Sequence, residues 1–229
     1  MNNPDYKPCP SQEYSTPACK HSCTNTGYTK AFAADLNFNA AIAADGSLAG
    51  LWRCIETLPP GDHGPGTQPG ATVLHSVRAS DWRNASSYVY SAQPAFAAQG
   101  FGSEDPFVWI AKDGSFHALL HDEQGLPGKH FPDITRGSAY GRHAWSRTGE
   151  LGNWSISPWV GGSLAYNSTV HFADGGSHVF LRRERPHLVL GKDRSLIALS
   201  NGAAGSADPN QMCFTLVQPI RSTEEEKVS

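Results

Sequence analysis

Carboxylates lie beside arginines and amides at several points of this chain. Glu104 and Asp105 open the stretch EDPFVWIAKDGSFHALLH, and Glu184 lies within RRERPHLVL. Two carboxyl groups in one site can act as a general acid and a general base. The acid must keep its proton near the working pH, which requires burial or a neighbouring carboxylate. These three residues are therefore the first candidates for chemistry.

Two interpretations of Glu184 are open from its neighbours alone. It is either an ion-paired residue at the start of a strand or an acid displayed in a site. In an extended strand Arg183 and Arg185 point to the opposite face from Glu184. Arg182 lies on the same face, two residues back, and is therefore the more serious objection to an acid role.

The segments that must position these residues form an internal repeat. Three stretches align without gaps: NFNAAIAADGSLAGLWR (37–53), DPFVWIAKDGSFHALLH (105–121) and RPHLVLGKDRSLIALSN (185–201). Each has an apolar run, a tight turn and a second apolar run. Because Asp-Gly between two such runs is a strong hairpin signal, the repeat predicts a β-hairpin used at least three times. Arg194 replaces the glycine in the third copy, which predicts another turn type or a strained residue.

A second echo lies between the hairpins, at 72–90 and 141–159. Two hairpins in sequence make a four-stranded antiparallel unit, which is one blade of a β-propeller. We therefore expect an all-β propeller in which about three to four blades are visible, whereas known propellers have about four to eight. Either the first thirty residues complete the ring irregularly or the sequence lacks a blade, and we favour the second.

A propeller would bring equivalent residues of each copy to one mouth, because the innermost strands begin near the central channel. The strand starts and the ends of the second strands then supply the candidate site residues: Asn37, Glu104, Asp105, Glu184, Arg185, Arg53, His121 and Asn201. Structural roles stay open for several of them. Asp105 precedes Pro106, and Asp-Pro often simply begins a strand or turn. His117 and His143 are expected to be ordinary surface or packing residues.

The overall composition excludes some partners. The net charge is −3 with 18 Lys and Arg residues, which indicates no basic surface for nucleic acid or an anionic membrane. No apolar run approaches the roughly 20 residues of a membrane span. We expect a monomer with three regions: an irregular cysteine-containing segment (1–34), the propeller domain (35–220) and a disordered tail (221–229).

Cysteines and glycosylation motifs point to the secretory pathway. Cys9, Cys19 and Cys23 crowd the N-terminus, where disulfides are favoured over a zinc site because paired C-x-x-C ligands are missing. Three Asn-x-Ser/Thr motifs agree with this interpretation and begin at Asn84, Asn153 and Asn167. We therefore expect a secreted glycoprotein whose leader is not part of this sequence.

Several motifs together resemble one family. The stretches EDPFVWIAKDGSFHALLH, GRHAWSRTGELGNW, AYNSTVHFADG and RRERPHLVL are similar to the five-bladed β-propeller glycoside hydrolases. These include the family 43 arabinanases and xylosidases and their levansucrase and invertase relatives, and the match is closest to uncharacterised eukaryotic members. The resemblance covers roughly residues 35–220. It implies action on an oligosaccharide or polysaccharide without a cofactor, although a structural calcium ion in the channel stays open.

The resemblance also implies roles for particular residues. Glu184 matches the general acid, although Arg185 replaces a glycine of that motif, and Asp105 matches the carboxylate that orients the acid or tunes its pKa. The base is not found, because Asn37 occupies the corresponding strand start and an amide cannot take a proton from water.

The alternative is a non-catalytic propeller that binds glycans or partners through the same mouth. Arg53, Arg183 and Arg185 would then favour an acidic sugar, and a sialidase-like enzyme is a subordinate option because arginines suit bidentate recognition of a carboxylate.

Overall fold

The chain is built almost entirely from antiparallel β-strands. The computed structural model describes residues 34–56, 71–96, 103–122, 140–156, 164–205 and 213–220. Within these ranges the only helical element is a short 3₁₀ turn at Ala85–Ser87. The expected all-β class is confirmed. The N-terminal cysteines and the tail at 221–229 lie outside the described residues.

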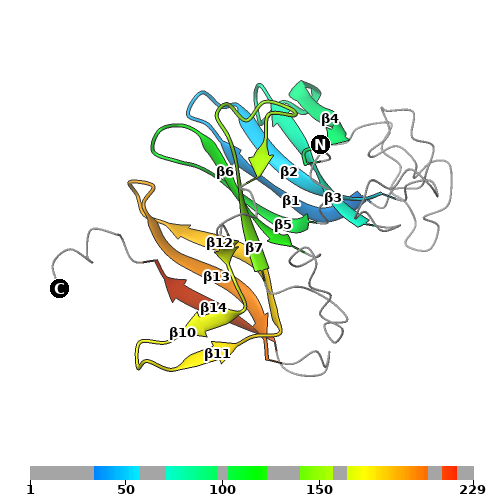
Figure 1. Cartoon of the computed structure of the whole chain (residues 1–229). Coiled ribbons are helices and arrows are strands. Elements are labelled where there is room, and N and C mark those ends of the chain that lie inside the picture. The colour runs from blue at the N-terminus through cyan, green and yellow to red at the C-terminus, as the bar shows by residue number, and fades with distance from the viewer. Residues whose placement is uncertain are drawn as a thin grey trace.

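The first two sheets are formed by strands that follow one another along the chain (Figure 1). Sheet 1 contains β1 (Ala34–Ile42), β2 (Leu48–Glu56), β3 (Ala71–Ala79) and β4 (Tyr88–Pro94). Sheet 2 contains β5 (Ser103–Ile110), β6 (Phe116–Asp122) and β7 (Tyr140–Ser146), followed by β8 (Ser155–Ile156) and β9 (Leu164–Tyr166). Both short strands pair with β7, β8 near its end and β9 near its start, so two pieces together form the fourth row.

The remaining strands form a small hairpin and a third sheet. The hairpin consists of β10 (Thr169–His171) and β11 (Ser177–Val179). Sheet 3 consists of β12 (Arg182–Leu190), β13 (Leu196–Ala204) and β14 (Phe214–Pro219), again in chain order. The four sheets are thus local meanders, which explains why an internal repeat of hairpins was visible in the sequence.

The three predicted hairpin turns are confirmed. In each turn an aspartate Oδ1 accepts hydrogen bonds from the backbone N–H and the hydroxyl of the serine two residues later, as Asp113 does from Ser115. Gly46 and Gly114 have φ of 84° and 86°, where glycine carries no Cβ penalty. Arg194 has φ of 64° at the same place, so the third turn holds the strained residue that its sequence predicted.

A fourth Asp-Gly turn joins the hairpin strands β10 and β11. There the N–H of Gly176 donates to Asp174 Oδ1, and Gly175 has φ of 86°. The sequence carries the same signal at this point, Asp174-Gly175, so the hairpin is used more often than the three aligned copies.

Apolar side chains fill the spaces between successive sheets. Sheets 1 and 2 share a core that includes Leu51, Leu74, Val108, Leu120 and Trp154. Sheets 2 and 3 share a second core, in which Phe107, Trp109 and Leu119 pack with Leu188 and Leu199. The sheets therefore stack in chain order, and β5, the first strand of sheet 2, contacts both β1 and β12. Among the residues that the structure describes, this stack is open and forms no closed ring, so the five-bladed arrangement stays a prediction.

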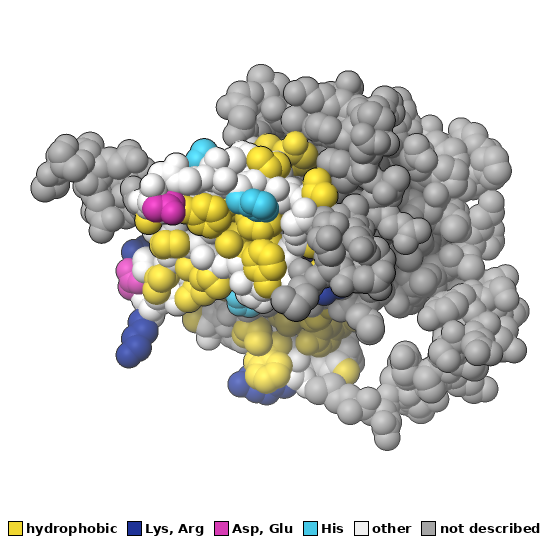
Figure 2. Space-filling view, turned by 90° about the horizontal axis from the view of Figure 1, so that it is seen from below, with side chains coloured by type: hydrophobic (Ala, Val, Ile, Leu, Met, Phe, Trp, Pro, Cys, Tyr) yellow, Lys and Arg dark blue, Asp and Glu magenta, His cyan; other side chains and the backbone are white. Residues whose placement is uncertain are grey.

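The outer face of the molecule at sheet 3 is rich in exposed apolar side chains. Figure 2 shows hydrophobic side chains gathered on the side that lies lowest in Figure 1, where the hairpin and β14 are found. Among the described residues of 164–205 and 213–220, the exposed large hydrophobic residues are Phe172, Val179, Leu181, Val189, Leu196, Ile197, Phe214 and Val217. In the same part of the chain Cys213 is exposed and forms no disulfide. No helix among the described residues is long and apolar enough to span a membrane.

Candidate functional site

The first strand of each sheet is irregular where the repeat begins. Pairing shifts register between Ala34 and Phe38 in β1, between Glu104 and Phe107 in β5, and between Glu184 and His187 in β12. Such bulges bend a strand and re-aim its side chains, and they are common next to functional sites. The irregularity therefore falls on the residues that the sequence placed at the mouth.

Two of these bulges hold a strained residue directly before a proline. Asp105 and Arg185 have φ of 49° and 53° and precede Pro106 and Pro186. A residue before proline normally adopts an extended conformation, and a left-handed conformation costs a side-chain-bearing residue roughly 1–2 kcal/mol. A strained backbone conformation persists only where the surrounding structure maintains it, and residues in such conformations are common at functional sites.

The aligned starting residues of the three repeats meet in space. The side-chain amide of Asn37 donates a hydrogen bond to Oδ1 of Asp105. The Nε of Arg185 lies 4.0 Å from Oδ2 of the same carboxylate. Asn37, Asp105 and Arg185 come from β1, β5 and β12, so three sheets contribute equivalent positions to one cluster, which we call the mouth cluster.

The carboxyl group at the centre of this cluster is poorly solvated. The side chain of Asp105 is 8% exposed. Burial raises the pKa of Asp105, and Glu184 adds to the rise, whereas His121, Arg185 and Arg53 pull the pKa down. Because burial is the largest influence, the pKa of Asp105 lies above its ordinary value, which favours the protonated form of this carboxyl group.

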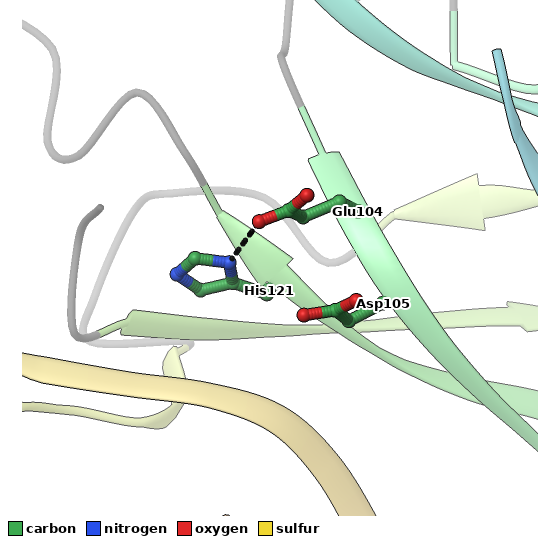
Figure 3. Close-up of side chains that lie close together, drawn as sticks. All are labelled: Glu104, Asp105 and His121. Carbon is green, nitrogen blue, oxygen red and sulfur yellow. Dashed lines mark hydrogen bonds and ion pairs between the residues drawn. The ribbon is translucent and has the colours of Figure 1, made fainter. Parts of the chain in front are cut away.

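Glu104 is held by two partners from neighbouring strands. Arg53 of β2 forms an ion pair with it, and Nδ1 of His121 lies 3.0 Å from its Oε1. His121 is itself fully buried, with 1% of its side chain exposed. Figure 3 shows Glu104, Asp105 and His121 projecting to the same side of the strands. These residues form a fixed arrangement of donors and acceptors beside the mouth cluster.

The same three residues are the only described group whose donors could hold a metal ion. One ligand atom from each of Glu104, Asp105 and His121 lies within 4.8 Å of the others. Calcium takes about six to eight oxygen ligands, whereas this set supplies two carboxylates and an imidazole nitrogen. Arg53 also neutralises Glu104 already, so an ion would have to displace it. The donor set fits calcium poorly.

Glu184 is paired with the arginine that shares its face of the strand. Nε and Nη2 of Arg182 lie 2.7 and 2.6 Å from Oε1 of Glu184. The sequence argument that singled out Arg182 is confirmed. The side chain of Glu184 remains 16% exposed, so it stays accessible to a small ligand while its charge is balanced.

Arg183 and Asn201, two predicted binding residues, lie on the opposite side of sheet 3. Arg183 is 1% exposed and donates to the backbone oxygen of Asn167 at 2.6 Å, to Asn201 Oδ1 at 2.7 Å and to Gln218 Oε1 at 2.6 Å. Its guanidinium also lies over the ring of Tyr166, 4.9 Å from the centroid. The hydrogen bonds of both residues hold β12 in place beneath Glu184, so we assign them a structural role instead of contact with a ligand.

A buried ion pair next to His121 was not singled out by the sequence. Nε of Arg142 lies 2.5 Å from Oδ2 of Asp122, and both side chains are almost fully buried. The only signal in the sequence was Asp122 at the end of the apolar strand β6, because Arg142 lies near the start of β7 in a mostly polar stretch. Burial lowers the pKa of Arg142, whereas the charge of Asp122 and its hydrogen bond to Arg142 oppose that shift.

Comparisons with known proteins assign no family to this chain. No protein-family model and no curated protein matches it. A crystal structure of a protein of unknown function from Dyadobacter fermentans DSM 18053 is similar, with 17% sequence identity and a TM-score of 0.42. That match covers 80% of this chain and 54% of the other, so the chain spans about half the length of that structure.

Proposed function

We propose that this chain is a glycoside hydrolase-like protein of the five-bladed propeller type, with its sheets serving as blades. Its site is the mouth cluster with the paired carboxylates around it. The observation that carries the proposal is the meeting of Asn37, Asp105 and Arg185. Equivalent positions of three repeats converge at one point, as blade starts do around a channel, and the point is polar and strained instead of apolar.

The chemical character of the site suits a sugar. Glu104 and Glu184 are each balanced by an arginine, and Asn37 adds an amide. Fixed donors and acceptors of this kind can exchange hydrogen bonds with several hydroxyl groups, and specificity in ligand sites comes from a few such placed polar groups. A polyhydroxylated oligosaccharide or polysaccharide is the ligand class that we propose.

The surroundings of the two candidate catalytic carboxyls favour an exchange of roles. The family resemblance implies Glu184 as the acid and Asp105 as an orienting group. However, burial raises the pKa of Asp105, while Glu184 is bound by Arg182. We therefore propose Asp105 as the group that protonates the leaving oxygen and Glu184 as the ionised carboxylate that supports the developing positive charge.

The test is hydrolysis of a panel of aryl glycosides and polysaccharides by the wild type and by Asp105→Asn and Glu184→Gln. Each change should lower the rate by about a hundredfold or more, as is typical for loss of an acid–base group. Asp113→Asn, in an exposed hairpin turn, is the matched control and should keep full activity. A pH profile whose basic limb disappears in Asp105→Asn and persists in Glu184→Gln would assign the acid to Asp105.

A specific observation favours the second candidate, a non-catalytic glycan-binding propeller. Among the described residues of the mouth, every carboxylate is already engaged: Glu104 by Arg53, Glu184 by Arg182 and Asp105 by Asn37. None is left over to activate water. The side chain of Arg185 is 79% exposed and is available to the carboxylate of an acidic sugar. Glycan binding by the wild type without any sugar release would establish this reading over the hydrolase.

We also propose that the protein is a secreted, monomeric glycoprotein. Asn84, Asn153 and Asn167, which begin the three glycosylation motifs, are all exposed on turns or strand ends. An endoglycosidase-dependent loss of mass after expression through a eukaryotic secretory pathway would test it, and a chain of unmodified mass at all three asparagines would refute it.

A further inference from the structure

A cavity of about 660 Å³ lies between sheets 2 and 3, at the end of β5 opposite to the mouth cluster. Its floor is apolar and includes Trp109, Leu119, Leu188 and Leu199. Residues of two hairpin turns form its edge, among them Arg194. Cavities of about 300–1,000 Å³ with an apolar lining and a few polar groups are typical small-molecule sites.

Two histidines form one wall of the cavity. Nδ1 of His117 lies 2.8 Å from Nε2 of His143, and Nε2 of His117 lies 2.8 Å from the hydroxyl of Ser115. The ring of His117 also stacks on Trp109, with centroids 5.2 Å apart. Burial lowers the pKa of both histidines, and that of His143 falls to about 4. At neutral pH this wall is therefore polar but uncharged.

Arg194 is the distinctive residue at the edge. It adopts φ of 64° where the equivalent turns have Gly46 and Gly114 at 84° and 86°. The left-handed backbone conformation costs arginine roughly 1–2 kcal/mol relative to glycine. Glycine would remove this strain, and residues that keep such a strained backbone are common at functional sites. Its Nη1 donates to the backbone oxygen of Ala111 at 3.3 Å, across the edge of the cavity.

The two turns carry Lys112, Lys192 and Arg194 against Asp113 and Asp193, so their charges sum to one positive charge. Lys112 is paired with Asp193 at 2.9 Å. No carboxylate of the described residues lies within ion-pair distance of Arg194, and the wall formed by His117 and His143 is neutral at pH 7. The edge therefore presents a net positive charge above an apolar floor.

We propose that this cavity is a second ligand site, which takes a small amphipathic carboxylate. The aromatic or aliphatic body of the ligand lies between Trp109 and the leucines, and its carboxylate pairs with Arg194. The guanidinium matches a carboxylate in its planar, forked geometry. This site is separate from the mouth and does not depend on carbohydrate chemistry there.

The test is calorimetric titration with 3-phenylpropionate and with 3-phenylpropionamide, its neutral counterpart. The carboxylate should bind the wild type, and the amide should bind about tenfold or more weakly, because a charge-assisted hydrogen bond contributes about 1.5–3 kcal/mol. Arg194→Gly should show the same loss for the carboxylate while unfolding at a temperature no lower than the wild type, since glycine suits this turn. Asp105→Asn, at the mouth, should bind as the wild type does.

A cavity-filling variant locates the binding independently of charge. Ala165 of β9 lines the cavity and is exposed, so Ala165→Trp should fold and abolish binding of both ligands. The proposal is overturned if the wild type binds no carboxylate at about 10 mM, where even a millimolar site would be nearly saturated. It is equally overturned if Arg194→Gly or Ala165→Trp binds as tightly as the wild type.

Discussion

Asn37 donates a hydrogen bond to Asp105 although 68 positions separate them in the sequence. The two residues begin the first and second copies of the hairpin repeat, so the alignment of the copies is reproduced as contact between the sheets. Arg185, which begins the third copy, lies 4.0 Å from the same carboxylate. Each sheet has a bulge where its copy of the repeat begins, and the stacking of the three sheets brings the residues at these bulges together as a polar cluster.

Replacement of Asp105 by asparagine should stabilise the fold at neutral pH. Burial raises the pKa of Asp105, so the folded state holds its proton more tightly than the unfolded state does, and the group's contribution to stability falls as pH rises above its ordinary value of 3.8. Asparagine keeps the shape and removes the buried charge. The free energy of unfolding in urea at pH 7 should rise by about 1 kcal/mol, at the cost of function.

The pH dependence separates this cause from a change in packing. The difference between Asp105→Asn and the wild type should shrink as the pH falls towards 4, because the folded wild-type carboxyl takes up its proton first and the unfolded one begins to do so near its ordinary value of 3.8. A difference that stays constant between pH 7 and pH 4 would contradict the burial argument. Asp113→Asn, which removes an exposed turn carboxylate whose pKa is lowered by the Ser115 hydroxyl, should show the opposite sign.

Removal of the Arg183 guanidinium should be strongly destabilising. Its partners are the neutral oxygens of Asn167, Asn201 and Gln218, and burial lowers its pKa. Arg183→Met would leave the buried oxygen of Asn201 without its donor, at a cost of about 1–3 kcal/mol, and would also remove the bonds to the less buried oxygens of Asn167 and Gln218 and the packing of the guanidinium. Urea unfolding should show a loss of roughly 3 kcal/mol or more.

A lysine variant tests whether charge alone suffices at that position. Arg183→Lys keeps the charge but loses the fork that reaches several oxygens at once, so it should recover only part of the lost stability. Arg182→Met, in the partly exposed neighbouring pair, is the comparison and should cost less than about 1 kcal/mol. Equal losses at Arg182 and Arg183 would show that burial does not set the difference.

Gly141 should tolerate no side chain. A Cβ added there would lie 1.9 Å from Cε1 of Tyr166, a ring that is buried against Arg183. Gly141→Ala must displace that ring and should lower the free energy of unfolding by about 1–3 kcal/mol. Gly202→Ala is the matched control in β13, because its nearest neighbour is a backbone oxygen of Glu184 at 3.8 Å. Equal thermal unfolding temperatures for the two variants would refute the steric argument.

Local chemistry made the hairpins predictable from the sequence. The Asp-x-Ser turns are closed by bonds between residues two apart, so they are visible without any knowledge of the tertiary structure. Strain at Arg194 followed from the same comparison. The pairing of Arg182 with Glu184 followed from the two-residue period of a strand.

The repeat predicted which strand starts and strand ends lie together, but not which of their side chains pair across the sheets. The Arg53–Glu104 pair joins β2 to β5, and its existence depends on how two sheets stack. The His117–His143 pair depends on the register of β6 against β7, which the long intervening connection leaves open in the sequence. Arg183 was expected to face an acidic sugar, but its side chain is buried and bonds within sheet 3, as strand alternation opposite to Glu184 allows.

The His117–His143 pair should make the fold sensitive to mild acid. Burial lowers the pKa of His143 from 6.5 to about 4, so between these values the unfolded state binds a proton that the folded state does not. Stability is then complete above pH 6.5 and falls as the pH drops towards 4. Between pH 7 and pH 5 the wild type should lose up to about 2 kcal/mol of unfolding free energy through this group.

Two variants test this cause. His143→Phe keeps an aromatic ring beside Trp109 and should lose correspondingly less stability over the same pH interval. His171→Gln, on the exposed hairpin, should follow the wild type. Urea unfolding at both pH values measures the difference, and parallel losses in His143→Phe and the wild type would show that the acid sensitivity arises elsewhere.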